Sequence, residues 1–239
     1  MKFDGQRFLV IYSGVLTAAF VVAMLCGFTR APAKMSLSEL DVQRINVREP
    51  DGTLRLVVSG SSLAPGIIIK GKEYPHPNRK VAGMIFFNDE GTENGGLIFG
   101  GEKTKDGIKE SYGHLSFDAY EQDQTMALNS QEEAKGRSTK LQFTDYPAHS
   151  IVQEIELMNS IKDLPKDQKD ARLAEFFKQH GKAARRMLLA RDYDGSVVLA
   201  MNDTQGRPRI RMKVAEDGAP SLQMLDENGK VVSQLVPKN

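Results

Sequence analysis

The carboxyl-terminal stretch from Met187 to Leu235 has the sequence MLLARDYDGSVVLAMNDTQGRPRIRMKVAEDGAPSLQMLDENGKVVSQL, and it decides the fold. Short apolar runs alternate in it with turn sequences that contain Asp, Asn and Gly. Gly and Asn adopt the positive φ angles that tight hairpin turns need. The stretch therefore predicts an antiparallel meander with strands at Met187–Ala190, Val197–Met201, Ile210–Val214, Leu222–Leu225 and Val231–Leu235.

The first half of the chain shows the same chemistry. Residues Val42 to Val58 alternate in period two around Pro50-Asp51-Gly52, which predicts a β-hairpin. Lys72 to Lys80 contains two prolines and is predicted to be a loop. The spacing is typical of an all-β sandwich, barrel or roll. Further strands are expected at Ile67–Ile69, Val81–Phe87, Leu97–Phe99, His114–Phe117, Thr125–Leu128 and Thr139–Phe143.

A helical pair interrupts the strands. Apolar residues recur every three or four positions from Ile151 to Ile161, which predicts an amphipathic helix over His149–Lys162. Pro165 is placed to open a second helix and Gly181 to end it. We therefore expect a mainly β fold with an inserted helical pair, an α+β fold of short-strand antiparallel meanders.

This pattern divides the chain into six segments. A similarity between Ile45–Val58 and Leu188–Met201 permits a duplication of β units, or only the repeated use of Asp-Gly turns. The segments are a leader at 1–7, a transmembrane helix at 8–28, a linker at 29–41, a first β-rich unit at 42–146, the helical pair at 147–183 and the carboxyl-terminal meander at 184–239.

The segment Phe8–Phe28, FLVIYSGVLTAAFVVAMLCGF, contains no charged residue. A helix of this length, at about 1.5 Å per residue, spans a hydrocarbon layer of roughly 30 Å. A cleaved signal peptide has a shorter apolar region followed by a small-x-small site, but the nearby triplet Ala31-Pro32-Ala33 has proline at its centre. Leu25 before Cys26 argues against a lipoprotein signal. The segment predicts an uncleaved single span, which would hold the protein in the lipid bilayer.

The flanking charges give little preference for either orientation. Lys2 and Arg7 precede the span, while Arg30 and Lys34 follow it. A short leader is easily retained inside the cell while the rest of the chain is exported. We therefore expect a single-pass protein of the cell membrane with an extracytoplasmic carboxyl-terminal domain.

Composition limits the function further. The chain has 239 residues, with 32 Lys and Arg against 31 Asp and Glu, so its net charge of +1 predicts no nucleic-acid partner. Its single cysteine, Cys26, lies in the predicted span. The remainder therefore has no disulfide and no thiolate metal site or nucleophile.

No Gly-rich phosphate loop, nucleophile elbow or zinc helix is present. The residues Asn88 to Gly96 gather carboxylates and amides, which suit calcium but equally suit a solvated turn. Gly95 to Gly101 has paired glycines that would let another backbone approach closely, or would form a bulge. Four histidines lack metal-ligand spacing and are expected in loops or on the surface. They are His76, His114, His149 and His180.

One strand carries a Ser–His–Asp set. Period two places His114, Ser116 and Asp118 on the same face of it. A catalytic triad rarely comes from one strand, because its groups must converge around one reacting atom. We interpret the set as a polar strand face, with Leu115 and Phe117 pointing inwards. No catalytic, cofactor-binding or metal-ligating residue is assigned.

The apolar span, Gly95–Gly101, Ser116–Gln124 and the closing meander resemble a group of uncharacterised bacterial single-pass membrane proteins of no assigned function. The resemblance implies a bacterial origin and extends over nearly the whole chain. It brings no activity and no functional residue.

Two functions compete. The favoured one is a non-enzymatic, membrane-anchored binding or assembly module of the cell envelope, with an envelope protein or polymer, or a second copy of the chain, as partner. The rival is an envelope hydrolase or sugar-processing enzyme that uses carboxylates such as Asp118, Glu121 and Asp123. A pocket that holds two of these, one with a raised pKa, would favour the enzyme.

Overall fold

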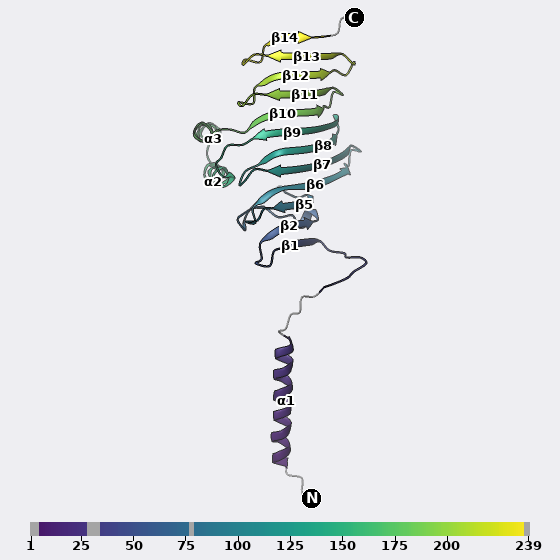
Figure 1. The fold of residues 1–239 in the computed structure, drawn as a ribbon, viewed down its shortest axis with the longest axis vertical. Coiled ribbons are helices and arrows are strands. Elements are labelled where there is room, and N and C mark those ends of the chain that lie inside the picture. Colours follow the sequence, from purple (N-terminus) through teal and green to yellow (C-terminus); the bar gives the residue numbers. More distant parts are fainter. Residues whose placement is uncertain (1–4, 28–33, 77–78, 237–239) are drawn as a thin grey trace. The chain divides into compact units, whose positions relative to one another are not determined.

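The computed structural model describes residues 5–27, 34–76 and 79–236. The chain forms two units, Met1–Asp41 and Val42–Asn239. The first contains helix α1, Gly5–Gly27, and the second contains every strand and the other helices described (Figure 1).

Helix α1 has 23 residues, is uncharged and mostly apolar after Arg7, and is long and apolar enough to cross a membrane. It confirms the predicted helix, whose last residue, Phe28, lies outside the described residues. A helix of this kind at the amino terminus is consistent with a signal sequence or with a single membrane anchor.

The second unit is organised around one twelve-stranded sheet in which every strand runs antiparallel to its neighbours (Figure 1). The mainly β fold is thereby confirmed. The expected sandwich, barrel or roll is wrong, because each strand pairs only with those next along the sheet and β1 and β14 remain at opposite edges. The strands in sheet order are β1 (Arg44–Arg48), β2 (Leu54–Ser59), β5 (Ala82–Phe87), β6 (Glu93–Lys103), β7 (Lys109–Asp118), β8 (Gln124–Glu133), β9 (Gly136–Asp145), β10 (Ala184–Arg191), β11 (Val197–Asn202), β12 (Pro208–Val214), β13 (Pro220–Leu225) and β14 (Val231–Leu235).

One turn geometry joins most of these strands. In the last hairpin the Asp226 N–H donates to the Lys230 carbonyl and the Gly229 N–H donates to the Asp226 carbonyl, at 2.9 and 3.1 Å. Gly229 has φ 79°. This is a type I turn closed by a glycine bulge. Within the described ranges the same bonds recur in the turns at 49–53, 88–92, 104–108, 192–196, 203–207 and 215–219. The segments Ile45–Val58 and Leu188–Met201 both contain this turn.

The central strands are longer than predicted. The segments β6 to β9 each span 10 or 11 residues, because polar ends continue the hydrogen-bonded ladder beyond the apolar centres.

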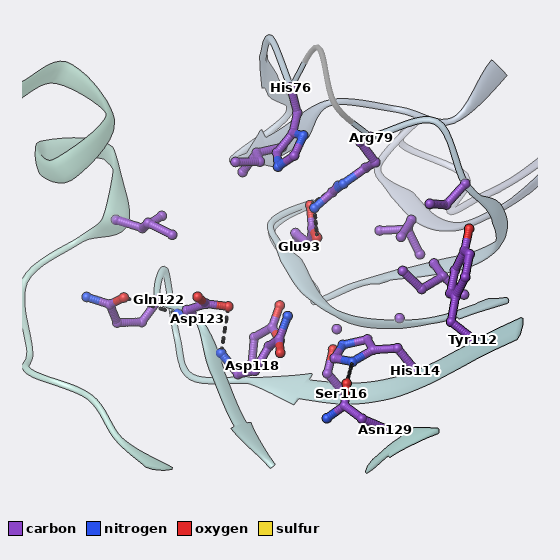
Figure 2. A pocket seen from close by; sticks show the side chains of 18 of the residues that line it. His76, Arg79, Glu93, Tyr112, His114, Ser116, Asp118, Gln122, Asp123 and Asn129 are labelled. Atoms are coloured by element: carbon purple, nitrogen blue, oxygen red, sulfur yellow. Dashed lines mark hydrogen bonds and ion pairs between the residues drawn. The ribbon is translucent and has the colours of Figure 1, made fainter. Parts of the chain in front are cut away.

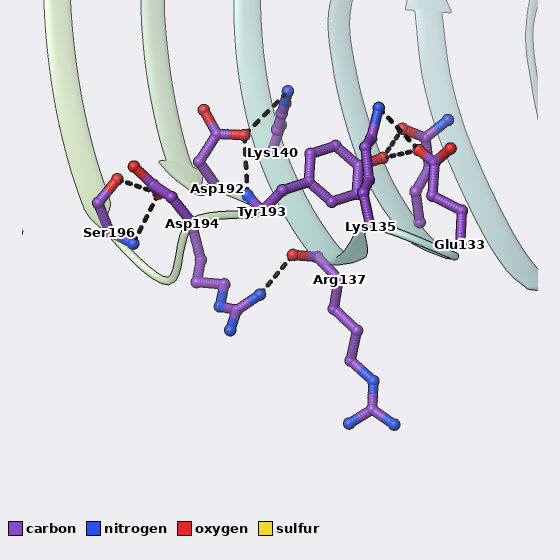
Figure 3. Close-up of polar contacts among 10 residues, drawn as sticks. Glu133, Lys135, Arg137, Lys140, Asp192, Tyr193, Asp194 and Ser196 are labelled. Carbon is purple, nitrogen blue, oxygen red and sulfur yellow. Dashed lines mark hydrogen bonds and ion pairs between the residues drawn. The ribbon is translucent and has the colours of Figure 1, made fainter. Parts of the chain in front are cut away.

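Polar side-chain contacts also connect neighbouring turns (Figure 3). The hydroxyl of Tyr193, in the β10–β11 turn, donates to Glu133 of β8 and lies 3.1 Å from the Gln131 side-chain oxygen, and the Lys135 ammonium lies 4.2 Å from the Tyr193 ring centroid. The hydrogen bond to Glu133 raises the pKa of Tyr193 to about 12.

Helices α2 (Ile151–Ile161) and α3 (Lys166–His180) form the predicted pair. The Ser150 side chain caps α2, Pro165 precedes α3, and Gly181 ends it with φ 86°. The pair is an insertion between two strands that pair directly, since β9 and β10 are in register from Asp145 opposite Ala184 onwards.

A two-stranded hairpin, β3 (Ile67–Ile69) with β4 (Lys72–Tyr74), forms a separate small sheet. Strand β4 lies in the predicted loop Lys72–Lys80, so that prediction is wrong at its start. The turn at Lys70 and Gly71, both with positive φ, folds this segment back on β3. The hairpin places Ile68 against a buried cluster with Leu54, Val57, Ile85 and Phe87.

The two faces of the large sheet differ. Residues directly opposite each other on neighbouring strands share a face. We call covered the face that carries Val57, Ile85 and the β3–β4 hairpin. The other, the bare face, carries Phe117, which is 46% exposed, and its neighbour Leu115. The expectation that both point inwards is therefore wrong.

Two rows of side chains cross the bare face from β1 to β14. The central row is Ile45, Val58, Met84, Leu97, Leu115, Leu128, Leu141, Leu189, Leu199, Met212, Leu222 and Leu235. The second row is Val47, Leu56, Phe86, Gly95, Phe117, Met126, Phe143, Met187, Met201, Ile210, Met224 and Ser233.

Candidate functional site

A cavity of about 560 Å³ opens on the covered face of the sheet (Figure 2). Strands β5 to β8 form its floor, the β3–β4 hairpin and the residues after it form one wall, and Ile151 of α2 contributes to another. Its volume lies within the range of sites for small molecules. Its polar lining includes His76, Arg79, Glu93, Tyr112, His114, Ser116, Asp118, Gln122, Asp123, Gln124, Asn129 and Gln131.

The strand register assembles this lining. His114 lies opposite Ile98 on β6 and Asn129 on β8, and Tyr112 lies opposite Gln131. His114, Ser116 and Asp118 all line the cavity, which confirms that period two places them on one face.

Asp118 has the most strongly altered chemistry in the cavity. Burial is the main cause that raises its pKa to about 7, and the charges of Glu93 and Asp123 add to the effect. The Arg79 charge and a hydrogen bond with Ser116 act in the opposite direction. The Asp118 Oδ1 is buried without a hydrogen-bond partner. A carboxyl group of this kind exchanges a proton near neutral pH.

Arg79 and Glu93 form an ion pair in the wall. The two guanidinium nitrogens lie 2.9 and 2.8 Å from the two carboxylate oxygens, and the side chains are 17% and 13% exposed. Arg79 also donates to the Gly66 carbonyl at 3.1 Å. The bidentate pairing compensates both charges. Asp118 and Asp123 therefore supply the uncompensated carboxylates of the lining.

Asp123 lies at the exposed rim of the cavity, where its Oδ1 accepts the Gln124 N–H at 2.9 Å. Deeper in, the His114 Nδ1 lies 2.6 Å from the Asn129 Oδ1. An amide oxygen only accepts, so Nδ1 carries the hydrogen of this bond. The cavity thus offers acceptors of several kinds.

The turn before Asp123 keeps the two backbone hydrogen bonds of the other turns, from the Ala119 N–H to the Asp123 carbonyl and from the Gln122 N–H to the Ala119 carbonyl, but its backbone conformation differs. It has no glycine, and Glu121 adopts φ 48°. Its buried Gln122 donates to the His149 carbonyl at 3.0 Å, and the Ile151 N–H donates to the Glu121 carbonyl at 2.7 Å. These bonds attach the start of α2 to the sheet. Strained backbone concentrates at functional sites.

The Glu121 side chain does not line the cavity. It pairs with Lys70 of the β3–β4 turn, and this contact is the main cause that lowers its pKa. Of the three carboxylates that the sequence suggested, the cavity brings together Asp118 and Asp123 and leaves out Glu121. Sequence spacing gave no sign of Arg79, Asn129 or Gln131, because strand register and the packing of the segment after β4 bring them to the cavity. Glu93 belongs to the polar stretch Asn88–Gly96, but its pairing with Arg79 was not predicted.

The histidines separate into two pairs. His76 and His114 line the cavity. His149 lies in the loop before α2, as expected, and its side chain is 4% exposed, lies 2.7 Å from the Glu154 carboxylate and packs edge-on against Phe176. His180 lies next to it, with ring centroids 5.3 Å apart. The expectation of a loop or surface position is wrong for His114, which is partly buried within strand β7. Among the described residues no group of three His, Cys, Asp or Glu side chains could hold a metal ion.

The other motifs have structural roles. The Asn88 side chain accepts from the N–H groups of Glu90 and Thr92, and β6 already begins at Glu93, so the polar stretch is a turn followed by a strand. Gly95 has φ 128°, and a Cβ there would lie 2.2 Å from the Ser116 carbonyl oxygen. The backbone that approaches this glycine closely is therefore strand β7.

No protein-family model matches the chain, and no curated protein matches it.

Proposed function

We propose that the chain is a membrane-anchored binding module of a bacterial cell envelope whose cavity takes a small hydroxylated ligand with a cationic group. The observation that carries this proposal is the pair of uncompensated carboxylates, Asp118 and Asp123, in one cavity, with the Asp118 Oδ1 buried and unpartnered. A ligand ammonium would supply the missing charge and hydrogen bond.

The rest of the lining supports hydroxyl groups on the same ligand. Gln122, Gln124, Asn129 and Gln131 present amides, and Ser116 presents a hydroxyl group. Tyr112 and the isoleucines supply apolar surface for the ligand's carbon skeleton. The lining thus combines polar groups that can orient a ligand with apolar surface that can contact its carbon atoms.

Three hexoses that differ in charge test the ligand class. We expect the full chain in non-ionic detergent to bind glucosamine more tightly than N-acetylglucosamine, and glucuronic acid least, by isothermal titration calorimetry. A bound ammonium favours the charged form of Asp118, so binding at pH 7 should release a proton and its heat should vary with the ionisation enthalpy of the buffer.

The matched variants are Asp118→Asn in the cavity and Asp106→Asn on an exposed turn. Asp118→Asn should abolish both the preference for glucosamine and the proton release, while Asp106→Asn should leave them unchanged. Equal binding of glucosamine and glucuronic acid, or binding of neither hexosamine, would count against the proposed ligand.

A second candidate is glycoside hydrolysis, favoured because the cavity joins Asp118, whose pKa lies at about 7, with Asp123. A carboxyl group with that pKa suits a general acid, and a second carboxylate suits a base or nucleophile. If this is the activity, the chain should cleave p-nitrophenyl glycosides, and Asp118→Asn and Asp123→Asn should each lower kcat by about 100-fold or more. Hexosamine binding without cleavage would leave the binding module as the function.

A further inference from the structure

The bare face of the sheet differs from an ordinary protein surface. Every residue of its central row is apolar, and the second row departs from this only at Gly95 and Ser233. None of the apolar side chains in the two rows is buried, and Leu189 and Met212 are each 46% exposed. Soluble surfaces rarely show an apolar patch larger than a few hundred Å².

The area of this patch is that of a stable interface. Twelve strands at about 4.8 Å spacing and two side-chain rows along each strand cover about 53 Å by 14 Å, or roughly 700 Å². A standard protein interface removes about 800 Å² from each partner. The two rows alone therefore supply nearly all the apolar area that one side of such an interface needs.

The composition of the face is also that of a contact surface. All six methionines located in strands lie in the two rows, and no residue of either row is charged. Methionine is flexible and fills irregular gaps at binding surfaces. Charged side chains of the same face, such as Arg191 and Arg137, lie outside the rows.

The sheet is shaped for stacking. The axes of the strands from β1 to β14 are similarly oriented in Figure 1, with the chain direction alternating from strand to strand. Sheets of many strands normally accumulate a large twist, and flat ones are typically stabilised by stacking or by side-chain ladders. Two flat sheets pack face to face at about 10 Å, with their side chains interdigitated.

We propose that the bare face binds the bare face of a second copy of this chain, so that two single-layer sheets form one symmetric sandwich. A two-fold contact places the same rows against each other, and because the rows are uncharged it buries no unpaired charge. The cavity lies on the opposite face of each sheet, so the proposal is independent of the proposed function.

A second copy fits better than lipid. The sheet is open, with β1 and β14 at its edges, and open sheet edges do not occur within the hydrocarbon of a bilayer because their backbone groups would be unsatisfied. A facing sheet covers the side chains and leaves both edges in contact with water.

The test uses the full chain in non-ionic detergent, with its mass measured by light scattering after gel filtration. In a Cys26→Ala background, Met212→Cys reports on the bare face and Lys213→Cys, the next residue of β12, reports on the covered face. Both positions are partly exposed in the single chain. We expect a dimer in which Met212→Cys reacts with maleimide at least about ten-fold more slowly than Lys213→Cys.

The double variant Leu189→Glu and Met212→Glu should raise the dimer dissociation constant by about 100-fold or more, because each carboxylate would be buried unpaired. Its circular dichroism should be unchanged, since both side chains are half exposed in one copy. Lys213→Glu is the control and should stay dimeric. If the double variant fails to fold, the difference in maleimide reaction rate between Met212→Cys and Lys213→Cys is enough to test the proposal.

Three results would overturn the proposal. The first is a monomer in which both cysteines react alike, which would mean an uncovered face. The second is a monomer with Met212→Cys protected, which would mean that detergent or lipid covers the face. The third is a dimer in which Met212→Cys reacts as fast as Lys213→Cys, which would place the contact elsewhere.

Discussion

Asp118 shows how one position in the sheet changes the behaviour of a common side chain. The residue ends β7 and lines the cavity together with residues of the segment after the β3–β4 hairpin and of α2. Its carboxyl group is largely shielded from water there. Nearby Glu93 and Asp123 add repulsion. The same residue on the bare face would behave as an ordinary acid.

This environment predicts a dependence of stability on pH. The pKa of Asp118 is about 7 in the folded chain against 3.8 as its ordinary value, so the folded state binds more protons between these limits. The free energy of unfolding therefore falls as pH rises from about 4 to about 7. Allowing for solvent screening, we expect this group to contribute about 2 kcal/mol to that fall.

Urea unfolding of the full chain at pH 4.5, 6 and 8 checks this. Asp118→Asn should remove about 2 kcal/mol of the fall and should be more stable than the natural chain at pH 8. Asp106→Asn, on an exposed turn, is the control and should follow the natural chain. An unchanged profile in Asp118→Asn would show that the group titrates like an exposed acid.

Glycines occur in the strands and turns for two different structural reasons. Gly229 has φ 79° in a solvent-facing turn, and a Cβ there would meet nothing within 4 Å. Gly95 also has positive φ, but a Cβ would meet the backbone of β7 at 2.2 Å. Gly229 is required only because its backbone adopts a positive φ, whereas Gly95 is required also because strand β7 approaches it too closely for a side chain.

Alanine substitution should separate these two requirements. Gly229→Ala should cost about 1 kcal/mol, the price of a left-handed conformation for alanine. Gly95→Ala should cost more than about 3 kcal/mol, because β6 and β7 must also move apart. Gly113→Ala, without positive φ and with free space around it, should be nearly neutral. Thermal unfolding of the three variants gives the order, and a similar loss for Gly95 and Gly113 would remove the steric explanation.

At the scale of the whole molecule, α1 and the sheet are separate units of one chain. The apolar helix is consistent with a signal sequence or with a single membrane anchor, and we propose the anchor. The turn at 226–230 is a suitable reporter for the sheet unit, because Asn228 at its tip is exposed.

Cysteine labelling in intact bacteria tests the topology. In a Cys26→Ala background, Asn228→Cys should react with a membrane-impermeant maleimide without lysis, and the chain should stay with the membrane fraction. Labelling only after lysis would place the sheet in the cytoplasm, and recovery of the chain in the medium would show that α1 is a cleaved signal. An Asn228→Ser chain with Cys26 also replaced is the unlabelled control.

Sequence alone determined the parts that depend on neighbours along the chain. The five closing strands, the Asp-Gly turns and the helices at 151–161 and 166–180 follow from periodicity and turn chemistry, which act over a few residues. The common face of His114, Ser116 and Asp118 follows in the same way from the pleat of one strand.

Only the tertiary structure decided whether the strands close into a sandwich, which face is covered, and what surrounds Asp118. Alternation of apolar and polar residues marks the two faces of each strand but does not say whether a second layer covers the apolar one, so Leu115 and Phe117 were expected inside. Burial and pKa depend on groups such as Arg79 and Glu93, which register and hairpin packing bring close from distant parts of the sequence. These interactions depend on distance in space, and for this chain that distance is set by the pairing of twelve strands.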